Sequence, residues 1–299
     1  MSAPIKNVTL AGATGNIGTV ALEKFTASKF NVQVLRRLGS KSTFPPHITV
    51  IDVDYNSVDG LTAALKNQDA LISTIPASES QAQRNLIDAA IAAGVRRYIP
   101  SEFGCNIDNA NTRAAPIFGS KVVVQEYLKE KAAAGLVSYT LVYTGPMLDW
   151  GLEKQFIINT AGYKPVLFND GKAIFSTTNI DTIGRALVAI LEHFDETNNR
   201  AVYLEDLKTS QLRLVELAKQ AAPEKPWEVS FADLDEEAKK AGGELAKGNH
   251  DFSIIRTLLL QAIVSPSWGI NFAKSDNELL GLGTGSEEQV VEVLKKIIV

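Results

Sequence analysis

Residues 12–18, which read Gly-Ala-Thr-Gly-Asn-Ile-Gly, decide the fold. They directly follow the apolar run Val-Thr-Leu-Ala at 8–11 and precede a helix-like segment at 19–28, so a strand, a glycine turn and a helix follow in order. Gly12 lets the chain turn tightly, Gly15 lets the backbone approach a pyrophosphate, and Gly18 lets helix and strand pack closely. Phosphate oxygens can then lie on the N–H groups at the start of the helix. The stretch therefore predicts nucleotide binding in preference to a purely structural turn.

A basic loop follows the second predicted strand, at 32–35. An NAD-specific site usually has an acidic residue about 20 residues beyond the glycines, where it binds the ribose 2'-hydroxyl. This chain instead has Arg36, Arg37, Ser40 and Lys41. Two guanidinium groups, a hydroxyl and an ammonium suit a 2'-phosphate, so the loop predicts NADP rather than NAD. The alternative is a solvated basic loop, which is common at strand ends.

Composition narrows the class of protein. The chain has 299 residues, 45% of them apolar, enough for one large domain or two smaller ones. Its net charge of -4 and pI of about 5.6 argue against nucleic acid or an anionic membrane as partner. The N-terminus shows no apolar signal core, and Cys105 has no second cysteine to pair with, so a cytoplasmic location is expected. The three histidines are far apart in sequence, which predicts no metal site.

The first half of the chain alternates strands with helices. Further strands are predicted at 48–53, 70–75, 97–100 and 138–143, and helices at 61–66, 81–93 and 118–133. This alternation predicts a Rossmann-type, doubly wound parallel sheet in an α/β fold. Ligands of such sheets lie beyond the carboxyl ends of the strands, so segments 75–76, 101–104 and 143–146 should line one crevice. Residues 1–145 are therefore expected to form an NADP-binding domain.

The second half, residues 146–299, is expected to form a smaller, mostly helical substrate-binding region. Segments 166–168 and 173–175 flank an Asp-Gly turn and predict a β-hairpin. Helices are predicted at 181–192, 211–221, 234–246, 251–263 and 287–297, and Ser286 with Gln289 has the spacing of a capping box. Short strands at 201–204 and 227–230 are candidates to extend the sheet, so the domain boundary is soft.

With these residues in view, the chain resembles the NmrA-like branch of the atypical short-chain dehydrogenases. Within that branch it is similar to the isoflavone reductase-like enzymes, which include phenylcoumaran benzylic ether reductases and pinoresinol-lariciresinol reductases. The Pro-Ser-Glu-Phe-Gly run at 100–104 is the most specific match and looks most like the fungal members. The resemblance covers the N-terminal half well and the C-terminal half loosely. It rests on the glycine turn, Arg37, Asp54-Tyr55, Ser73-Thr74-Ile75, residues 98–104 and Lys121.

The resemblance implies roles for individual residues in binding NADPH. It assigns Thr14, Asn16 and Ile17 to the diphosphate, Arg37 and Lys41 to the 2'-phosphate, residues 73–75 to the nicotinamide side, and Lys121 to the active site. Together with the residue reading above, the expected NADPH site comprises Gly12, Thr14, Gly15, Asn16, Ile17, Gly18, Arg36, Arg37, Lys41, Asp54, Ser73, Thr74, Ile75, Ser101, Glu102, Phe103 and Lys121.

Lys121 has two possible chemical roles. The cofactor would supply hydride, and a protonated lysine would donate to a developing alkoxide, enolate or phenolate. A neutral lysine would act as a base, which requires burial or a nearby cation. The sequence does not decide between them. Aromatic and apolar residues around the predicted mouth suit a flat aromatic substrate, or else pack an interdomain core; the expected substrate contacts are Phe103, Tyr143, Met147 and Trp150.

A competing motif lies six residues beyond Lys121. Tyr127 and Lys131 satisfy the Tyr-x-x-x-Lys pattern of typical short-chain dehydrogenases, but Tyr127 also fits an apolar helix stripe, so a packing role is expected. Glu102 is expected either to hydrogen-bond the lysine or to cap a loop. Cys105 is expected to be inert, and residues 109–113 form either a mobile lid or an ordinary loop.

The function expected from the sequence is an NADPH-dependent reductase of a small aromatic or phenolic molecule. Hydride would go to a carbonyl, a conjugated alkene or a benzylic ether carbon, with Lys121 as general acid or base. The alternative is a catalytically silent, NADP-sensing NmrA-like regulator, although regulators of that kind lack the lysine. Quinone or general carbonyl reduction is a third possibility on the same fold. Oligomeric state is left open between monomer and homodimer.

Overall fold

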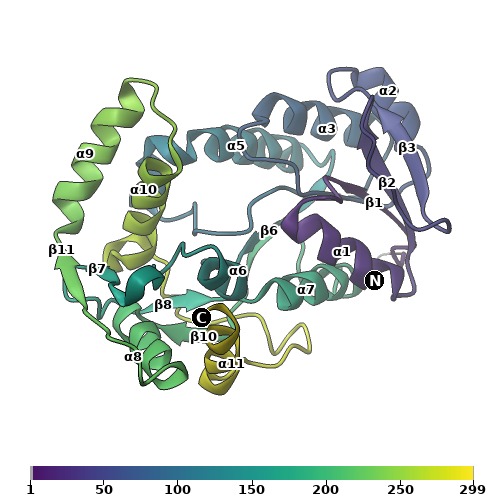
Figure 1. Ribbon diagram of the computed structural model, residues 1–299. Helices are drawn as coiled ribbons and strands as arrows, with labels where there is room; N and C mark the ends of the chain where they lie inside the picture. Colours follow the sequence, from purple (N-terminus) through teal and green to yellow (C-terminus); the bar gives the residue numbers. More distant parts are fainter. Residues whose placement is uncertain (1–2, 299) are drawn as a thin grey trace.

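The core of the molecule is a seven-stranded, wholly parallel sheet. The computed structural model describes residues 3–298. The strands are ordered β3-β2-β1-β4-β5-β6-β9, so the order reverses between β1 and β4, where the glycine turn leaves β1 (Figure 1). A ligand crevice is expected at this reversal. The strand bounds are β1 Asn7–Ala11, β2 Asn31–Arg37, β3 Thr49–Val53, β4 Ala70–Ser73, β5 Arg97–Ile99, β6 Ser138–Tyr143 and β9 Arg200–Tyr203.

Helices cover both faces of this sheet because its strands carry apolar side chains on both sides. On one face α1 (Asn16–Thr26) packs against α7 (Ile180–Glu192), and Leu10 and Val142 lie in their shared core. On the other face Leu71 and Tyr98 pack under three helices. Those helices are α2 Val58–Ala64, α3 Ser80–Ala92 and α5 Gly119–Ala133. Two covered faces confirm the Rossmann-type α/β fold.

We call the central sheet and the helices on its two faces the first lobe, and the rest of the chain the second lobe. Two elements from beyond residue 145 belong to the first lobe. Strand β9 pairs in parallel with β6, with Val202 opposite Val142, which confirms that the strand predicted at 201–204 extends the sheet. Helix α7 lies so close to α1 that a Cβ on Gly184 would be 2.7 Å from a methyl group of Val20. The chain therefore crosses from the second lobe back into the first.

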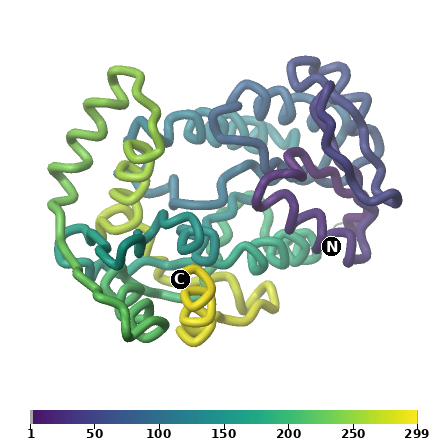
Figure 2. The backbone as a smooth tube through the Cα atoms, in the orientation of Figure 1, coloured from purple at the N-terminus to yellow at the C-terminus, as the bar shows by residue number. Residues whose placement is uncertain are grey.

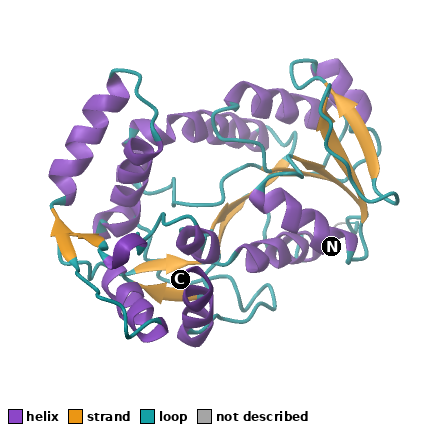
Figure 3. Ribbon diagram, viewed as in Figure 1, coloured by secondary structure: helices purple, strands orange, loops and turns teal. Residues whose placement is uncertain are grey.

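The second lobe is mostly helical, with only short strands (Figure 3). Leu214, Phe175 and Leu260 belong to its core. Its helices are α6 Leu148–Glu153, α8 Gln211–Ala221, α9 Leu234–Ala246, α10 Phe252–Val264 and α11 Glu287–Ile297, with the 3-10 turns η2 Ala161–Tyr163 and η3 Pro266–Trp268. Its strands are β7 Val166–Phe168, β8 Phe175–Thr177, β10 Leu207–Thr209 and β11 Ser230–Ala232. The capping box of Ser286 and Gln289 at the start of α11 is confirmed.

The predicted hairpin at 166–175 is wrong. The turn forms, with Asn169 at φ 52° and Gly171 at φ 69°, but β7 pairs in parallel with β11 and β8 pairs antiparallel with β10. Each strand thus finds its partner in a distant segment, and burial of Leu167 and Phe175 in the lobe core decides the pairing over the local turn signal. The strand predicted at 227–230 is also misplaced: the strand found there, β11, begins only at Ser230 and pairs with β7, so it does not join the central sheet.

The C-terminal segment ties the two lobes together. After η3 the chain runs back past β9, where Asp276 forms two hydrogen bonds with the backbone of Tyr203. The N–H of Asp276 donates to the carbonyl of Tyr203, and the carboxylate of Asp276 accepts from the N–H of Tyr203. Figure 2 shows this return in yellow, ending beside the second lobe. Helix α11 then packs on α6 and α8. In the described range, no helix has the length and apolarity needed to cross a membrane.

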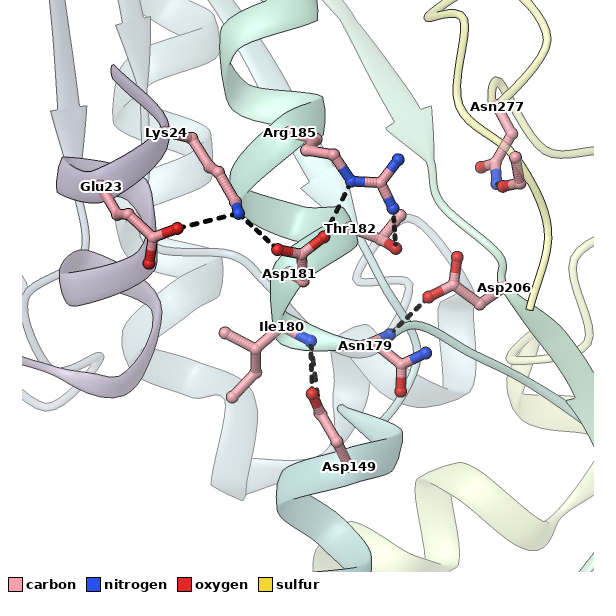
Figure 4. A network of polar contacts seen from close by, with 11 residues as sticks. Glu23, Lys24, Asp149, Asn179, Ile180, Asp181, Thr182, Arg185, Asp206 and Asn277 are labelled. Carbon is pink, nitrogen blue, oxygen red and sulfur yellow. Dashed lines mark hydrogen bonds and ion pairs between the residues drawn. The ribbon is translucent and has the colours of Figure 1, made fainter. Parts of the chain in front are cut away.

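Two carboxylates hold the start of α7. Asp206 accepts from the N–H of Asn179 at 2.8 Å, and Asp149 from α6 accepts from the N–H of Ile180 at 3.2 Å (Figure 4). Lys24 of α1 reaches Asp181 in the same helix turn. Burial raises the pKa of both Asp149 and Asp206. This network fixes α7 to α1, to α6 and to the loop that leaves β9.

Candidate functional site

The glycine turn is built around two glycines that accept no side chain. Gly12 has φ 86°, and a Cβ there would lie 2.7 Å from the carbonyl carbon of Thr74. A Cβ on Gly18 would lie 2.1 Å from the carbonyl oxygen of Gly12. The Thr74 hydroxyl donates to the carbonyls of Ala11 and Gly12, which locks the turn to the end of β4. The loop shape therefore depends on its neighbours on both sides.

Gly15 differs from these two glycines. The nearest atom to a Cβ at this position is 3.6 Å away, so the fold itself does not require glycine there. Gly15 is the N-cap of α1, whose first turn has neither a side-chain cap nor an acidic residue in the described structure. The N–H groups of Asn16 and Ile17 thus begin a helix that is ready to bind an anion, and the open side of Gly15 leaves room for one.

A cavity of about 160 Å³ extends from the glycine turn to the end of β2. Strand β1, which the glycine turn follows, and strand β2, which ends in Arg36 and Arg37, lie side by side in the sheet (Figure 1). Such a cavity suits the adenosine half of a dinucleotide. It is lined by Gly12, Ala13, Thr14, Leu35, Arg36, Arg37, Ser40, Ser42, Phe44, Tyr55, Ile75 and Pro76.

The basic residues at this cavity are not equivalent. Arg36 forms a two-pronged ion pair with Asp52 and donates to the carbonyl of Ser42. Arg37 has a side chain that is 60% exposed, and its one ion-pair contact, to Glu79 at 3.2 Å, is longer. Lys41 is exposed and outside the cavity wall. Asp54 is also outside it, and its carboxylate accepts from the N–H of Asn56 in a turn.

Lys121 lies in the first turn of α5, with its side chain 17% exposed. Its ammonium donates to the backbone carbonyl of Glu102 and lies 3.9 Å from Oε2 of the same residue. Burial raises the pKa of the Glu102 carboxyl to about 7, partly offset by the lysine charge. Lys121 and Glu102 are thus brought together: the lysine hydrogen-bonds the backbone carbonyl of Glu102, and the carboxyl group forms an ion-pair contact, with no hydrogen bond at Oε2 from any described residue.

The loop after β5 holds this pair in a fixed geometry. Phe103 has φ 26°, a conformation that is rare for a residue with a side chain. The carbonyl of Gly104 accepts from the N–H groups of Thr144 and Gly145, both at 3.1 Å. Ser101 is anchored through its N–H to the side chain of Gln83. Gly104 thus ties this loop to the end of β6, and β5 pairs with both β4 and β6 in the sheet. That these strand ends line one crevice stays a prediction, because residues 101–104 line none of the described cavities.

The expected substrate contacts are only partly placed to touch a ligand. Tyr143 is fully buried, and Gln125 donates to its hydroxyl at 2.8 Å, so it packs inside the core and lines no described cavity. Phe103 is also buried. Met147 is half-buried beside the α1 and α7 core. Trp150 borders a second cavity, of about 520 Å³, together with Thr14 and Asn16 of the glycine turn.

The largest cavity, of about 950 Å³, lies between the start of α5 and the α9–α10 pair. Ser120, next to Lys121, is in its wall, and so are residues 77–78, which follow the predicted nicotinamide segment 73–75. The residues of α9 and α10 in this wall were not predicted as site residues, because helical periodicity indicates the two helices but not what their faces contact. The lining residues are Ala77, Ser78, Asn111, Ala114, Ala115, Pro116, Ile117, Ser120, Gly242, Leu245, Ala246, His250, Ile255, Leu258, Gln261, Ser267 and Trp268.

Residues 109–113 contact the second lobe through side-chain hydrogen bonds. They contribute most of the short helix α4 (Ala110–Ala114), with Asn109 as its N-cap. The side chains of Asn109 and Asn111 donate to the carbonyl of Ser267, and Thr112 donates to that of Trp268. This segment therefore closes one side of the large cavity.

The remaining candidates behave as packing groups. The hydroxyl of Tyr127 donates to Asp88 on α3, away from every cavity described above, and Lys131 lies over the Tyr127 ring. Cys105 is buried, and burial raises the pKa of its thiol to about 12. Among residues 3–298, no three metal-binding side chains gather in one place.

Comparison with known sequences gives a consistent family. The sequence pattern of the NmrA-like family matches residues 4–241. The chain is 33% identical over 299 residues to oxidoreductase aprR of Aspergillus flavus, covering 97% of this chain and 98% of that one. It is 30% identical over 186 residues to isoflavone reductase homolog A622 of Nicotiana glauca, covering 56% of this chain and 59% of that one.

Solved structures show the same fold at lower identity. The leucoanthocyanidin reductase–NADPH complex from Vitis vinifera has a TM-score of 0.79 at 16% identity, covering 96% of this chain and 99% of that one. The structure of AtPrR2 with NADP+ and (+)pinoresinol has a TM-score of 0.78 at 17% identity, and the match covers 100% of this chain and 100% of that one.

Proposed function

The chain belongs to the NmrA-like family, and we propose that it is an NADPH-dependent reductase of small aromatic or phenolic molecules. The observation that carries this proposal is the position of Lys121. It lies in the first turn of α5, against Glu102 of the loop after β5 and next to Ser120, which lines a large, mostly apolar cavity; the glycine turn of the same lobe is ready to bind an anion. Its full-length relative aprR is named an oxidoreductase, and the leucoanthocyanidin reductase neighbour holds NADPH.

The residues of the first lobe fit this cofactor. The uncapped start of α1 would hold the diphosphate, with Gly15 leaving room for it, and the 160 Å³ cavity would take the adenosine. Arg37 is the freer of the two arginines in the cavity wall and would bind the 2'-phosphate, while Arg36, already paired with Asp52, shapes the wall. Segment 73–75 would lie on the nicotinamide side.

Bound NADPH supplies a hydride, and the protein must stabilise the negative charge that the substrate then develops. We assign this task to Lys121, acting as an acid. Its ammonium faces the backbone carbonyl and the carboxyl group of Glu102. In the substrate complex the ammonium would donate to a developing alkoxide, enolate or phenolate. It holds the proton at Nζ until the acceptor oxygen gains charge.

We infer the substrate class from the lining and the volume of the large cavity. Its wall is mainly aliphatic, with Trp268 as an aromatic surface and a few polar groups, among them His250 and Gln261. About 950 Å³ accommodates a molecule of one to three rings. The hydride acceptor would be a carbonyl, a conjugated alkene or a benzylic ether carbon. In one structural neighbour the bound molecule is pinoresinol, which is consistent with an aromatic ligand.

The proposal is tested by NADPH oxidation with a panel of aromatic enones, ketones, quinones and benzylic ethers. We expect turnover on at least one class, and loss of that turnover in Lys121→Ala. A parallel titration measures NADPH binding by both proteins. Tight NADPH binding without turnover on any panel member would contradict the reductase and favour an NADP-sensing regulator.

A further inference from the structure

We propose that Glu102 is a positioning residue for Lys121, whose carboxyl group holds the lysine ammonium in place when it is ionised. The inference rests on the proposed function in one respect, that Lys121 acts in the reaction. The coupling between the two side chains is a property of the protein alone and is testable without any substrate.

The geometry of the pair comes first. Glu102 offers two oxygens to the ammonium: its backbone carbonyl accepts a hydrogen bond, and Oε2 lies 3.9 Å away. The Glu102 side chain is 1% exposed, and Oε2 accepts no hydrogen bond from any residue between 3 and 298. A buried carboxyl oxygen without a donor is costly, so the nearby ammonium is what offsets the cost.

The backbone prevents this carboxyl from turning away. The N–H of Glu102 donates to the carbonyl of Pro100, and Phe103 follows with φ 26°. Gly104 is then tied to the end of β6 through its carbonyl. A Cβ on Gly104 would be 4.0 Å from Nζ of Lys121, so the loop also packs against the lysine itself. The backbone of both residues is therefore held in place, that of Lys121 by α5 and that of Glu102 by a constrained loop.

The other charged groups facing Glu102 are mostly engaged elsewhere. Lys129, from α5, pairs with Asp108 at 2.7 Å. Arg113, from α4, binds the side chains of Gln125 and Glu126 on α5. The titratable hydroxyl of Tyr143 and thiol of Cys105 also face this region and stay neutral, because burial raises the pKa of both. Among the ion pairs of the described residues, Glu102 is the one carboxyl that Lys121 contacts.

The burial of Glu102 makes this contact dependent on pH. Its pKa lies at about 7, raised by burial and lowered by the lysine, Lys129 and Arg113 charges. Above this value the carboxylate attracts the ammonium, and the lysine is held by charge as well as by the backbone carbonyl. Below it the carboxyl is neutral and only the carbonyl holds the lysine. The position of Lys121 thus responds to pH in the neutral range, through the charge of Glu102.

The direct test follows the Lys121 Cε resonance by NMR in protein labelled with 13Cε-lysine, with Lys121→Arg identifying the signal. We expect an inflection near pH 7 in the unmodified protein. In Glu102→Gln, which keeps size and burial but removes the charge, that inflection should vanish. A Lys121 signal without an inflection near pH 7 in the unmodified protein would overturn the proposal, whether or not the variant folds.

An activity profile gives the second readout. The ratio of kcat/KM at pH 8 to kcat/KM at pH 6 should be about tenfold lower in Glu102→Gln than in the unmodified enzyme, because only the unmodified enzyme gains a carboxylate at residue 102 as the pH rises. Glu102→Asp, which keeps the carboxyl group, should recover part of this pH dependence. A purely structural role would lower activity equally at both pH values. Failure of the reductase proposal would leave no activity to measure, but the NMR result would still stand.

Discussion

The guanidinium of Arg36 is paired in two-pronged fashion with the carboxylate of Asp52, with Nε 2.6 Å from Oδ1 and Nη2 2.8 Å from Oδ2. Its Nη1 donates to the carbonyl of Ser42, so three donors are used inside the protein. The neighbouring Arg37 lies across the pleat of β2 and is much more exposed. Asp52 therefore makes two adjacent arginines different: Arg36 is held by an ion pair inside the protein, and Arg37 stays mostly exposed.

The first prediction concerns cofactor choice. Arg37→Ala should weaken NADPH binding by about 10- to 100-fold and leave NADH binding nearly unchanged, because charge-assisted hydrogen bonds to the 2'-phosphate are lost. Arg36→Ala is the matched control and should change the NADPH to NADH ratio much less. Fluorescence titrations with both cofactors measure the ratio. A larger loss of discrimination in Arg36→Ala would assign the phosphate to Arg36.

The second prediction separates two glycines of the turn. Gly18→Ala should destabilise the fold by several kcal/mol or prevent folding, because its Cβ would overlap the carbonyl of Gly12. Gly15→Ala has space in the protein and should unfold within a few degrees of the unmodified protein, yet lose most NADPH affinity. Thermal unfolding with and without NADPH distinguishes these results. Normal NADPH binding by Gly15→Ala would show that the diphosphate does not approach there.

The third prediction decides between the two candidate lysine motifs. Lys121→Ala should lower kcat by about 100- to 10,000-fold, the usual contribution of a general acid, with NADPH affinity retained. Tyr127→Phe should keep full activity, because its hydroxyl binds Asp88 on α3 and reaches no described cavity. The measurement is kcat on the best substrate of the panel. Activity lost in Tyr127→Phe and kept in Lys121→Ala would reverse the assignment.

The fourth prediction tests the polar network at the start of α7. Asp206→Ala should cost about 1 to 2 kcal/mol of stability, because the N–H of Asn179 at the helix start loses its acceptor. Asp206→Asn keeps an acceptor oxygen and removes a buried charge whose pKa is raised by burial, so it should cost less. Urea unfolding of the two variants gives the difference. Equal losses would mean that the charge itself stabilises the helix start.

The sequence predicted the first lobe well because local signals there agree with the final packing. The glycine turn, the strands of the sheet and the lysine all lie where the motif and the alternation of strands and helices indicate. Distant pairing was harder to predict. The Asp-Gly turn at 170–171 forms, yet its flanking strands β7 and β8 pair with β11 and β10, because the lobe core decides their partners.

The candidate site was predicted on one side only. Glu102 follows the end of β5 and could be placed from topology, whereas Lys121, in the first turn of α5, was indicated by the family resemblance. Tyr143 also follows that rule, but the sequence could not indicate that Gln125 binds its hydroxyl inside the core. The opposite wall, with His250 and Trp268, depends on how α9 and α10 dock across the chain. Helical periodicity shows that such a face exists and gives no information about its partner.

The wall of the large cavity has a consequence for how this protein acquires new chemistry. Residues 242–268 form much of that wall, whereas the family pattern ends at residue 241. If this cavity holds the substrate, as proposed, mutations in its wall change what is bound without touching the glycine turn or the sheet. Selection would then exchange one substrate for another while the first lobe is inherited intact, and laboratory evolution aimed at a new substrate would best begin with the nine positions of this stretch that line the cavity.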